Sequence, residues 1–444
     1  MHTIASAAAA LAAGRTTSRA LVEAALARAE AGEGPRAFLK LHRDAALAAA
    51  EASDTLRRHA IVPSPLAGLP VSIKDLFDIA GEPTPAGSRV LADAPPATAD
   101  AVAVARLRAA GAIVIGRTNM SEFAYSGVGY NPHHGTPLAP WDRATGRVPG
   151  GSSSGAAVSV ADGMAFMGLG TDTGGSVRIP AALCGIAGFK PTARRVPQEG
   201  CFPLSPSLDS IGPLAASLAC CALTDAVLAG EAPVVPPALP VAGLRLLVPT
   251  TTLLDGLSPA VAAAFAQALS RLSGLGARIV EAPLPALGLI AEINRLGGFA
   301  AAESYHHHRA LLARAGNGYD QRVRARILRG AEQSAVDYLE IVALRRRLIA
   351  EVEGLLAPFD AFIGPTCPIQ APALAEVADD DGFTRNNLLL LRNTQVVNMI
   401  DGCSATLPIG PSIGLMISGP AMADRHILAV GLGIEAALAR GMAA

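Results

Sequence analysis

Two glycine- and serine-rich runs near the middle of the chain constrain its fold more than any other feature. The first run, GGSSSG, begins at Gly150, and the second, TDTGGS, ends at Ser176. Glycine adopts backbone conformations that other residues avoid, so each run predicts a tight loop. The segment that contains both runs consists mostly of small residues and continues to Thr192. An isolated run such as GGSSSG is most often an ordinary loop, so a functional interpretation needs support from the rest of the chain.

Short apolar runs alternate with helical patterns on both sides of this segment. GLPVSIK predicts a buried strand that ends at Lys74, followed by a helix over 100–110 and a strand over 112–116. Beyond the segment, LRLLVP and RIVEA predict two more strands with a helix between them. This alternation predicts an α/β fold rather than a helical bundle or a β-sandwich. The same signals give the remaining elements: helices over 19–31, 44–59, 119–125, 215–229, 259–273 and 421–440, a mainly helical stretch over 296–355, and strands over 244–249, 278–282, 360–366 and 412–418.

The composition excludes several classes of protein. Of the 444 residues, 51% are apolar and 16% are charged, which excludes general disorder. The net charge of −1 gives no strong field for nucleic acid or an anionic membrane. No apolar run is long enough to span a bilayer, and no basic residue precedes the alanine-rich N-terminal run as in a signal peptide. We therefore expect a single domain that has neither nucleic acid nor a membrane as partner.

The cysteines and histidines give no sign of a disulfide or metal framework. No cysteine belongs to a CxxC pair or lies near a histidine at metal-ligand spacing. Three consecutive histidines, 306–308, lie in a helical stretch, where successive side chains point in different directions, so we expect no metal site there. Free thiols are typical of a reducing compartment, and the sequence predicts a cytoplasmic protein. The six cysteines are Cys184, Cys201, Cys220, Cys221, Cys367 and Cys403.

The segment 150–192 offers serine nucleophiles but no histidine base. A serine hydroxyl is a weak nucleophile until a base accepts its proton, and the segment contains neither a histidine nor a GxSxG elbow. A buried neutral lysine is an alternative base because burial lowers the pKa of lysine, and Lys74 directly follows an apolar strand. Backbone N–H groups around Gly174 and Gly175 suit an oxyanion hole ahead of a serine. A phosphate-binding loop fits less well, because the GxGxxG and GK[ST] patterns are missing.

Several motifs together resemble the amidase signature family over nearly the whole chain. They are GLPVSIKDLFDIAG, GGSSSG, GTDTGGSVRIPAALCGIAGFKPT, GPTCP, VVNMIDGCSATLP and IGLMISGP. The resemblance implies one domain over residues 1–444, with a large, mixed and mostly parallel central β-sheet covered by helices on both faces. It also implies a variable, mainly helical region on the substrate side at about 295–355. The implied activity is hydrolysis of a carboxamide C–N bond of a small molecule, without a metal or cofactor, by a protein that could form a homodimer.

The resemblance also implies a Ser–cis-Ser–Lys triad. Matched position by position, Ser176 is the nucleophile, Ser152 is the bridging serine and Lys74 is the base. The peptide bond before Ser152 is expected to be cis. In the implied mechanism Lys74 takes a proton from Ser152, which takes one from Ser176, and the reaction passes through an acyl-enzyme. The backbone N–H groups expected to bind the oxyanion belong to Thr173, Gly174, Gly175 and Ser176.

Other matched residues have supporting roles in the family. Ser153 is expected to hydrogen-bond within its loop, and Asp172 to orient the oxyanion loop. Ser154 stands where many members have glycine, which leaves a one-residue shift of the bridging role open. Arg178 either meets an anionic substrate or forms a structural ion pair, and we favour the ion pair. Candidates for contact with the substrate are Tyr125 and Tyr130.

Two other functions fit the same motifs. The first is that of the amidase component of a tRNA-dependent amidotransferase, which uses the same triad to release ammonia within a complex. Against it, GNGYDQRVRARILRG lacks the Phe-Gly-x-Glu-Val run that we associate with that component. The second is a non-catalytic relative that serves in binding or assembly, and the intact triad argues against this function.

Overall fold

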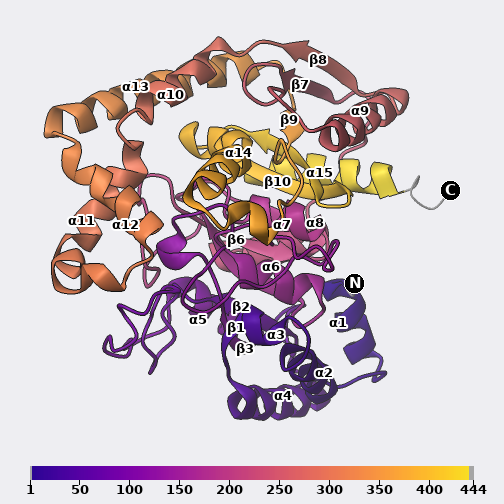
Figure 1. Ribbon diagram of the computed structural model, residues 1–444. Helices are drawn as coiled ribbons and strands as arrows, with labels where there is room; N and C mark the ends of the chain where they lie inside the picture. Colours follow the sequence, from indigo (N-terminus) through magenta and orange to yellow (C-terminus); the bar gives the residue numbers. More distant parts are fainter. Residues whose placement is uncertain (1–2, 440–444) are drawn as a thin grey trace.

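A mixed β-sheet of 11 strands runs through residues 3–439, the part of the chain that the computed structural model describes (Figure 1). The strands are β1 (Phe38–Leu41), β2 (Pro70–Lys74), β3 (Ile113–Thr118), β4 (Met167–Asp172), β5 (Ala187–Lys190), β6 (Ser210–Ala215), β7 (Arg245–Pro249), β8 (Arg278–Ala282), β9 (Ala361–Pro365), β10 (Cys403–Gly410) and β11 (Ile413–Gly419). Their order across the sheet is β1-β3-β2-β4-β6-β5-β10-β11-β9-β7-β8.

The directions of the strands confirm a mixed α/β sheet but correct the expectation that it is mostly parallel. Two parallel groups, β3-β2-β4 and β9-β7-β8, flank a centre in which every neighbouring pair from β4 to β9 is antiparallel. The strand–helix–strand alternation in the sequence comes from the two parallel groups. The central strands β4, β5, β6 and β10 are rich in glycine and small residues and gave no such signal, and β10 and β11 are joined too closely for a parallel crossover.

Helices cover both faces of the sheet, as expected. They are α1 (Ile4–Ala12), α2 (Ser18–Ala29), α3 (Gly34–Ala37), α4 (Arg43–Arg58), α5 (Val102–Ala109), α6 (Ser154–Ala161), α7 (Arg178–Cys184), α8 (Leu218–Ala229), α9 (Pro259–Gly274), α10 (Leu289–Ile293), α11 (Gly298–Ala315), α12 (Gln321–Leu328), α13 (Ala335–Leu356), α14 (Asp380–Met399) and α15 (Asp424–Ala439). Helices α5, α8, α9 and α15 share one hydrophobic core, and α2, α4, α6 and α7 share another. On β6, Ile211 and Ala215 belong to the first core and Leu214 to the second, because alternate side chains of a strand face opposite sides.

Helices α10–α13 form a separate group beside the sheet, drawn in orange at the left of Figure 1. Phe299 on α11 and Leu348 on α13 share a third core with Val396 on α14 and Phe362 on β9. This group therefore rests on α14 and on one end of the sheet. It confirms that residues 296–355 are mainly helical.

Most elements that the sequence predicts from periodicity occur within a few residues of their expected ends. Thr17 caps α2 by accepting a hydrogen bond from the N–H of Ala20, as the GRTTS break indicates. The predicted helix over 119–125 is wrong, because only the short 3₁₀ turn Glu122–Ala124 forms there and Phe123 adopts a left-handed backbone (φ 50°). Ser258 precedes α9, but its side chain makes no capping hydrogen bond. The predicted end of the last helix, residue 440, lies outside the described residues.

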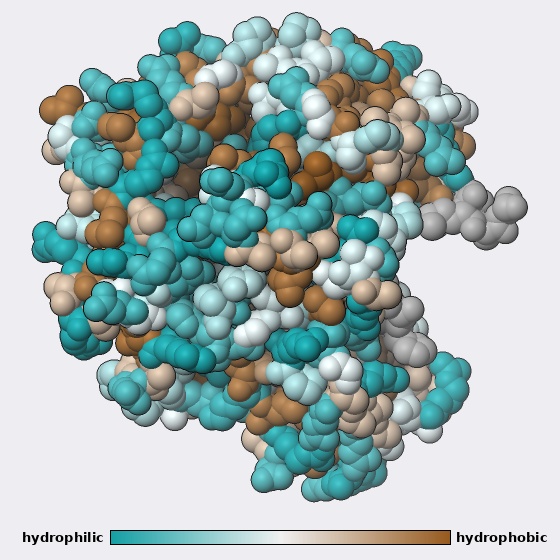
Figure 2. All heavy atoms as spheres, viewed as in Figure 1, coloured by the Kyte–Doolittle hydropathy of each residue, from teal (hydrophilic) through white to brown (hydrophobic). Residues whose placement is uncertain are grey.

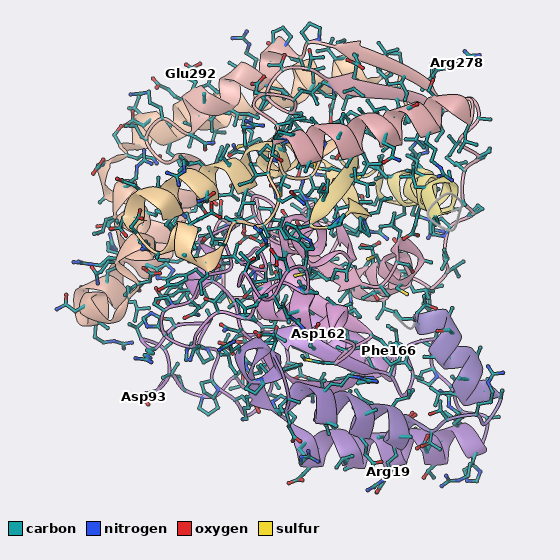
Figure 3. All side chains as sticks on the ribbon, turned by 45° about the vertical axis from the view of Figure 1, so that its right-hand side comes forward. Arg19, Asp93, Asp162, Phe166, Arg278 and Glu292 are labelled. Atoms are coloured by element: carbon teal, nitrogen blue, oxygen red, sulfur yellow. The ribbon has the colours of Figure 1, made fainter. Side chains whose placement is uncertain are left out.

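The N-terminal helices and the last parallel strands lie at opposite ends of the molecule. Figure 3 shows Arg19 on α2 at one end and Arg278 on β8 at the other, with the central strands between them. Within residues 3–439, no helix combines the length and apolar character that crossing a bilayer requires.

Candidate active site

Strand β2 carries Lys74 into the interior of the protein at its carboxyl end. Every residue of the strand is buried, and Lys74 is fully buried. Lys74 Nζ donates hydrogen bonds to Ser152 Oγ (2.7 Å) and Thr171 Oγ1 (2.8 Å). Burial lowers the pKa of Lys74 to about 7, although Cys201 and nearby carboxylates act in the opposite direction. A large fraction of Lys74 is therefore neutral near pH 7 and able to accept a proton.

The GGSSSG run forms a tight loop that places Ser152 against Lys74. The peptide bond between Gly151 and Ser152 is cis, as the resemblance implies. A Cβ at Gly151 would lie 2.6 Å from the backbone nitrogen of Gly129, so no side chain fits at Gly151 without a shift of the backbone. Ser154 already belongs to α6, and its Oγ contacts the carbonyl of Asn119. Lys74 thus contacts Ser152 rather than a neighbouring serine, which argues against a one-residue shift of the bridging role.

The TDTGGS run connects β4 to α7 and presents unpaired backbone amides. The N–H of Ser153 donates to the carbonyl of Ser176 (3.3 Å), so the two serine loops lie side by side. Gly175 has φ 140°, and a Cβ there would lie 2.1 Å from Thr394 Oγ1. Within residues 3–439, none of the four amides over 173–176 donates to a protein acceptor. These amides are therefore available to a ligand.

A buried ion pair supports this loop from behind. Arg178 Nε and Nη2 donate to the two carboxylate oxygens of Asp172 (3.0 and 2.9 Å), and both side chains are fully buried. Asn398 bonds to both partners. Although burial by itself raises the pKa of Asp172, the charge and hydrogen bonds of Arg178 lower it to about 2. Asp172 also accepts from the N–H of Val177 (3.2 Å), and Arg178 is a structural partner in this arrangement.

Loss of this pair should cost more stability than loss of any surface pair. In Asp172→Asn the charge of Arg178 stays buried without a counter-charge, and we expect the free energy of unfolding to fall by about 3–5 kcal/mol. Urea unfolding followed by circular dichroism measures this. Glu351→Gln is the matched control, because it breaks an exposed pair with Arg347 and should cost at most about 1 kcal/mol. Equal small losses in both variants would contradict the importance of the buried pair.

Sequence reasoning missed two residues that contact the expected site. Thr171 binds Lys74 Nζ, as described above. Asp209 accepts hydrogen bonds from Thr173 Oγ1 and from the N–H groups of Leu204 and Ser205. Burial raises the pKa of Asp209 to about 6. Asp209 lies in an irregular loop, where no periodic pattern marks a buried carboxylate, so only the fold reveals its contact with the oxyanion loop.

Ser176 lines a cavity of about 500 Å³ between the sheet and the helical group. Thr173 and Gly174 form the wall beside it, and Tyr125 contributes to another wall. Tyr130 does not line this cavity but packs edge-on against Phe383. In the space-filling view a hollow with brown, hydrophobic residues at its edge opens between α14 and the helices α10 and α11 (Figure 2). The remaining lining residues are Ala124, Ser126, Leu204, Leu208, Thr252, Leu287, Gly288, Ile290, Ala291, Asn294, Gly297, Ala300, Arg326, Arg329, Asn387, Leu388, Leu391, Arg392, Gln395 and Met399.

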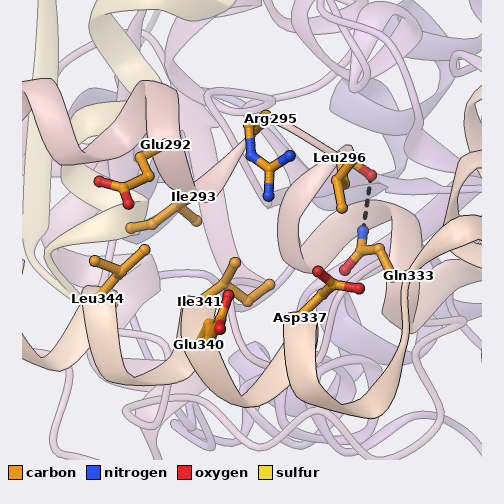
Figure 4. Close-up of a pocket in the computed structure, with 9 residues that line it drawn as sticks. All are labelled: Glu292, Ile293, Arg295, Leu296, Gln333, Asp337, Glu340, Ile341 and Leu344. Atoms are coloured by element: carbon orange, nitrogen blue, oxygen red, sulfur yellow. Dashed lines mark hydrogen bonds between the residues drawn. The ribbon is translucent and has the colours of Figure 1, made fainter.

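Other polar features lie apart from this cavity. His308 is buried, bonds to the hydroxyl of Tyr319 (Nδ1–Oη 2.9 Å) and has a pKa lowered to about 4 by burial, whereas His306 and His307 are exposed. No group of three or more metal-ligating side chains occurs within residues 3–439. A small pocket of about 50 Å³ lies between α10 and α13, where Gln333 Nε2 donates to the carbonyl of Leu296 (2.9 Å; Figure 4). None of the expected catalytic residues lines it.

Comparison with known proteins gives consistent relatives. The Amidase family model matches residues 20–428. 2-Amino-5-chloromuconic acid deaminase of Comamonas testosteroni is 39% identical over 406 residues, which cover 90% of this chain and 87% of that protein. A second relative, 36% identical over 97% of this chain and 95% of its own length, is the GatA-type component of the glutamyl-tRNA(Gln) amidotransferase of Chloroflexus aggregans.

A solved structure supports the same assignment. The crystal structure of an amidase is 35% identical and superposes with a TM-score of 0.89, over 98% of this chain and 99% of that one. The match therefore includes the mixed sheet, both loops and the helical group. Together with the family match, it shows that this chain belongs to the amidase family and is a hydrolase of C–N bonds.

Proposed function

We propose that the protein is an amidase that hydrolyses a small carboxamide through Ser176, Ser152 and Lys74. The observation that carries the proposal is the contact between a buried Lys74, whose pKa is near 7, and Ser152 in a loop that bonds directly to Ser176. When Lys74 is neutral, Ser152 can donate its proton along the same contact. A serine whose proton can pass to a buried base is an activated nucleophile.

The proposed reaction proceeds in two halves. Ser176 Oγ attacks the amide carbonyl as its proton moves to Ser152 and the proton of Ser152 moves to Lys74. A C–O bond forms, and the free N–H groups over 173–176 bind the oxyanion. The proton returns through Ser152 to the leaving nitrogen, the C–N bond breaks, and ammonia or an amine departs. Water then hydrolyses the acyl-enzyme, which releases a carboxylate and restores the hydroxyl of Ser176.

The surrounding residues hold this arrangement in place. The Asp172–Arg178 pair fixes the segment between β4 and α7, and Ser153 joins the two serine loops through its N–H. The helical region at about 295–355 forms the substrate side of the single domain, because α11, α12 and their connections supply part of the cavity wall. Tyr125 in that wall is a candidate substrate contact.

Gly175→Ala should damage catalysis more than stability. The added Cβ would collide with Thr394 Oγ1 and strain a backbone with φ 140°, so at least one oxyanion amide should turn away. Loss of one such donor lowers kcat by roughly 10²- to 10³-fold. Ammonia release from an amide panel measures this loss. Gly354→Ala on α13, where a Cβ meets nothing within 4 Å, is the control and should leave kcat unchanged. A Gly175→Ala variant with normal kcat would argue against these amides as the oxyanion hole.

We also propose a cytoplasmic location. All six cysteines, which lie within the described residues, are free, and five of them are buried. Free thiols persist in reducing compartments. Mass spectrometry of the native protein after thiol alkylation in cell lysate should find all six reduced, and a disulfide would contradict this location.

A second candidate function is ammonia release as one component of an amidotransferase complex. The 36% identity to the GatA-type component of the glutamyl-tRNA(Gln) enzyme over almost its full length favours it. Native mass spectrometry of the protein purified from its own host separates the two functions. A stable complex with other proteins, and ammonia release from glutamine only within it, would support the amidotransferase. An isolated chain that hydrolyses amides supports the free amidase.

The direct test of the proposed nucleophile needs no known substrate. A fluorophosphonate reacts covalently with an activated serine, and peptide mapping locates the added mass. We expect the label on Ser176 in the wild type and no label when Lys74 is replaced. A label elsewhere, or none in the isolated chain and in any complex, would sink the proposal.

A further inference from the structure

Three arginines line the cavity that contains Ser176, and no aspartate or glutamate does. They are Arg326 and Arg329 from the helical group and Arg392 from α14. Within residues 3–439 none of the three forms an ion pair, whereas Arg322, on the same helix as Arg326, pairs with Asp380 (2.7 Å). Arginine stays protonated at any pH that a protein tolerates, so the cavity holds positive charge that its own wall does not neutralise.

Arg326 and Arg329 lie one helical turn apart and repel each other. Burial lowers the pKa of Arg326, Tyr125 and Asp320 oppose this effect, and the nearby charge of Arg329 adds to it. Arg326 Nη1 donates to the carbonyl of Tyr125 (2.6 Å), and Arg329 Nη2 donates to the carbonyl of Arg295 (3.0 Å). Each guanidinium has five N–H donors, so these backbone contacts hold the side chains in place and leave several donors for a ligand.

Arg392 adds a third incompletely paired guanidinium on α14. Its Nε donates to Asn393 Oδ1 (3.2 Å), but its Nη2 is buried and has no hydrogen-bond partner among the described residues. Asp255 is near enough to favour its charge but forms no ion pair with it. A buried donor without a partner costs free energy, and an anion in the cavity would supply the missing acceptor.

We infer that the substrate is an amide that also carries a carboxylate, and that Arg326 and Arg329 bind this carboxylate while the amide lies at Ser176. The inference rests on the proposed amidase function. Guanidinium groups bind carboxylates through two parallel hydrogen bonds, which suits a pair of arginines with free donors. Leu204, Leu208 and Ile290 in the same wall contact the hydrocarbon between the two groups, and the volume suits a small molecule.

The test compares amides that differ only in charge. The probes are the monoamides of the three- to six-carbon dicarboxylic acids and the neutral alkyl amides of equal length, assayed by ammonia release. We expect the wild type to prefer the best anionic amide over its neutral partner by roughly 100-fold or more in kcat/KM. Arg326→Gln and Arg329→Gln should each lower kcat/KM for the anionic amide by roughly 10- to 100-fold, mainly through KM. Neither should change turnover of the neutral amide by more than about threefold.

Two further variants separate charge from geometry. Arg326→Lys keeps the charge but loses the planar fork, so it should recover only part of the preference. Arg309→Gln removes an exposed positive charge from α11 outside the cavity and should change nothing. Arg329 is exposed, so Arg329→Gln should fold even if a change at Arg326 does not.

Fluorophosphonate labelling distinguishes failure of this inference from failure of the proposed function. Labelling of Ser176 in all these variants shows that the nucleophile works, and the free dicarboxylates should slow it in the wild type and less in Arg326→Gln and Arg329→Gln. With Ser176 labelled, the inference is overturned by equal turnover of charged and neutral amides, by an unchanged preference in both glutamine variants, or by no protection from any dicarboxylate. An unlabelled Ser176 overturns the proposed function and the inference with it.

Discussion

Replacement of Ser176 by alanine should remove amide turnover and leave the fold intact. Ser176 Oγ is the atom that forms the covalent bond in the proposed reaction, and no other hydroxyl lies at the start of α7 beside the free amides. Loss of a serine nucleophile in enzymes of this kind lowers kcat by roughly 10⁴- to 10⁶-fold. Ammonia release measures the loss, and fluorophosphonate labelling should disappear at the same time.

The control for this variant is the neighbouring serine in the other loop. Ser153→Ala keeps the backbone N–H that bonds to the carbonyl of Ser176 and loses only a long contact from Oγ to the carbonyl of Thr171 (3.4 Å). It should retain most of the activity. If Ser176→Ala turned over amides at a rate near the wild type, the nucleophile would have to be another residue.

Lys74→Met should have the second-largest effect, and its size should depend on pH. The variant keeps the length of the side chain but has no nitrogen to accept a proton, and loss of a general base lowers kcat by roughly 10²- to 10⁴-fold. In the wild type, kcat/KM should rise as pH increases through about 7, because Lys74 becomes neutral there. The variant should lose this rise. A pH–rate profile that is the same in both proteins would contradict the role of Lys74 as the base.

The same variant should gain stability in a defined range of pH. The pKa of Lys74 is about 7 in the folded protein, against a reference value of 10.5. Below pH 7 both states carry the charge, so the folded state bears the full cost of burying it. The cost decreases as pH rises from about 7 to 10.5 and is absent above that range. Urea unfolding of Lys74→Met should therefore show a gain over the wild type at pH 6 that disappears near pH 11.

The sequence predicted the chemical groups of the site better than it predicted the sheet. Lys74 and the two serine loops carry long motifs, and the structure places Lys74 against Ser152 with Ser176 in the adjacent loop. The resemblance also anticipated the cis bond and the buried pair of Asp172 and Arg178. Tyr130 was placed near the substrate only by its position in the sequence, and the fold turns it toward Phe383 instead.

The parts that the sequence could not predict depend on contacts between distant segments. The direction of the central strands follows from which of them become neighbours, and small residues such as those of β4 and β6 carry no periodic signal of it. Asp209 meets Thr173 only after β6 has paired with β4. The three arginines of the cavity come from α12, its end and α14, and the sequence showed them only as scattered charges on helices.

Helix α14 links the shape of the cavity to the geometry of the catalytic loop. Leu391, Arg392 and Gln395 face the cavity, while Thr394 on the same helix donates to the carbonyl of Gly174 (2.6 Å) and fills the space beside Gly175. A rotation or shift of this helix that admitted a different substrate would also displace the amides of the oxyanion loop. Divergence of specificity along this lineage is therefore easiest by exchange of side chains on a fixed helix, and residues 388, 391, 392 and 395 are the positions where such exchange leaves the reaction itself undisturbed.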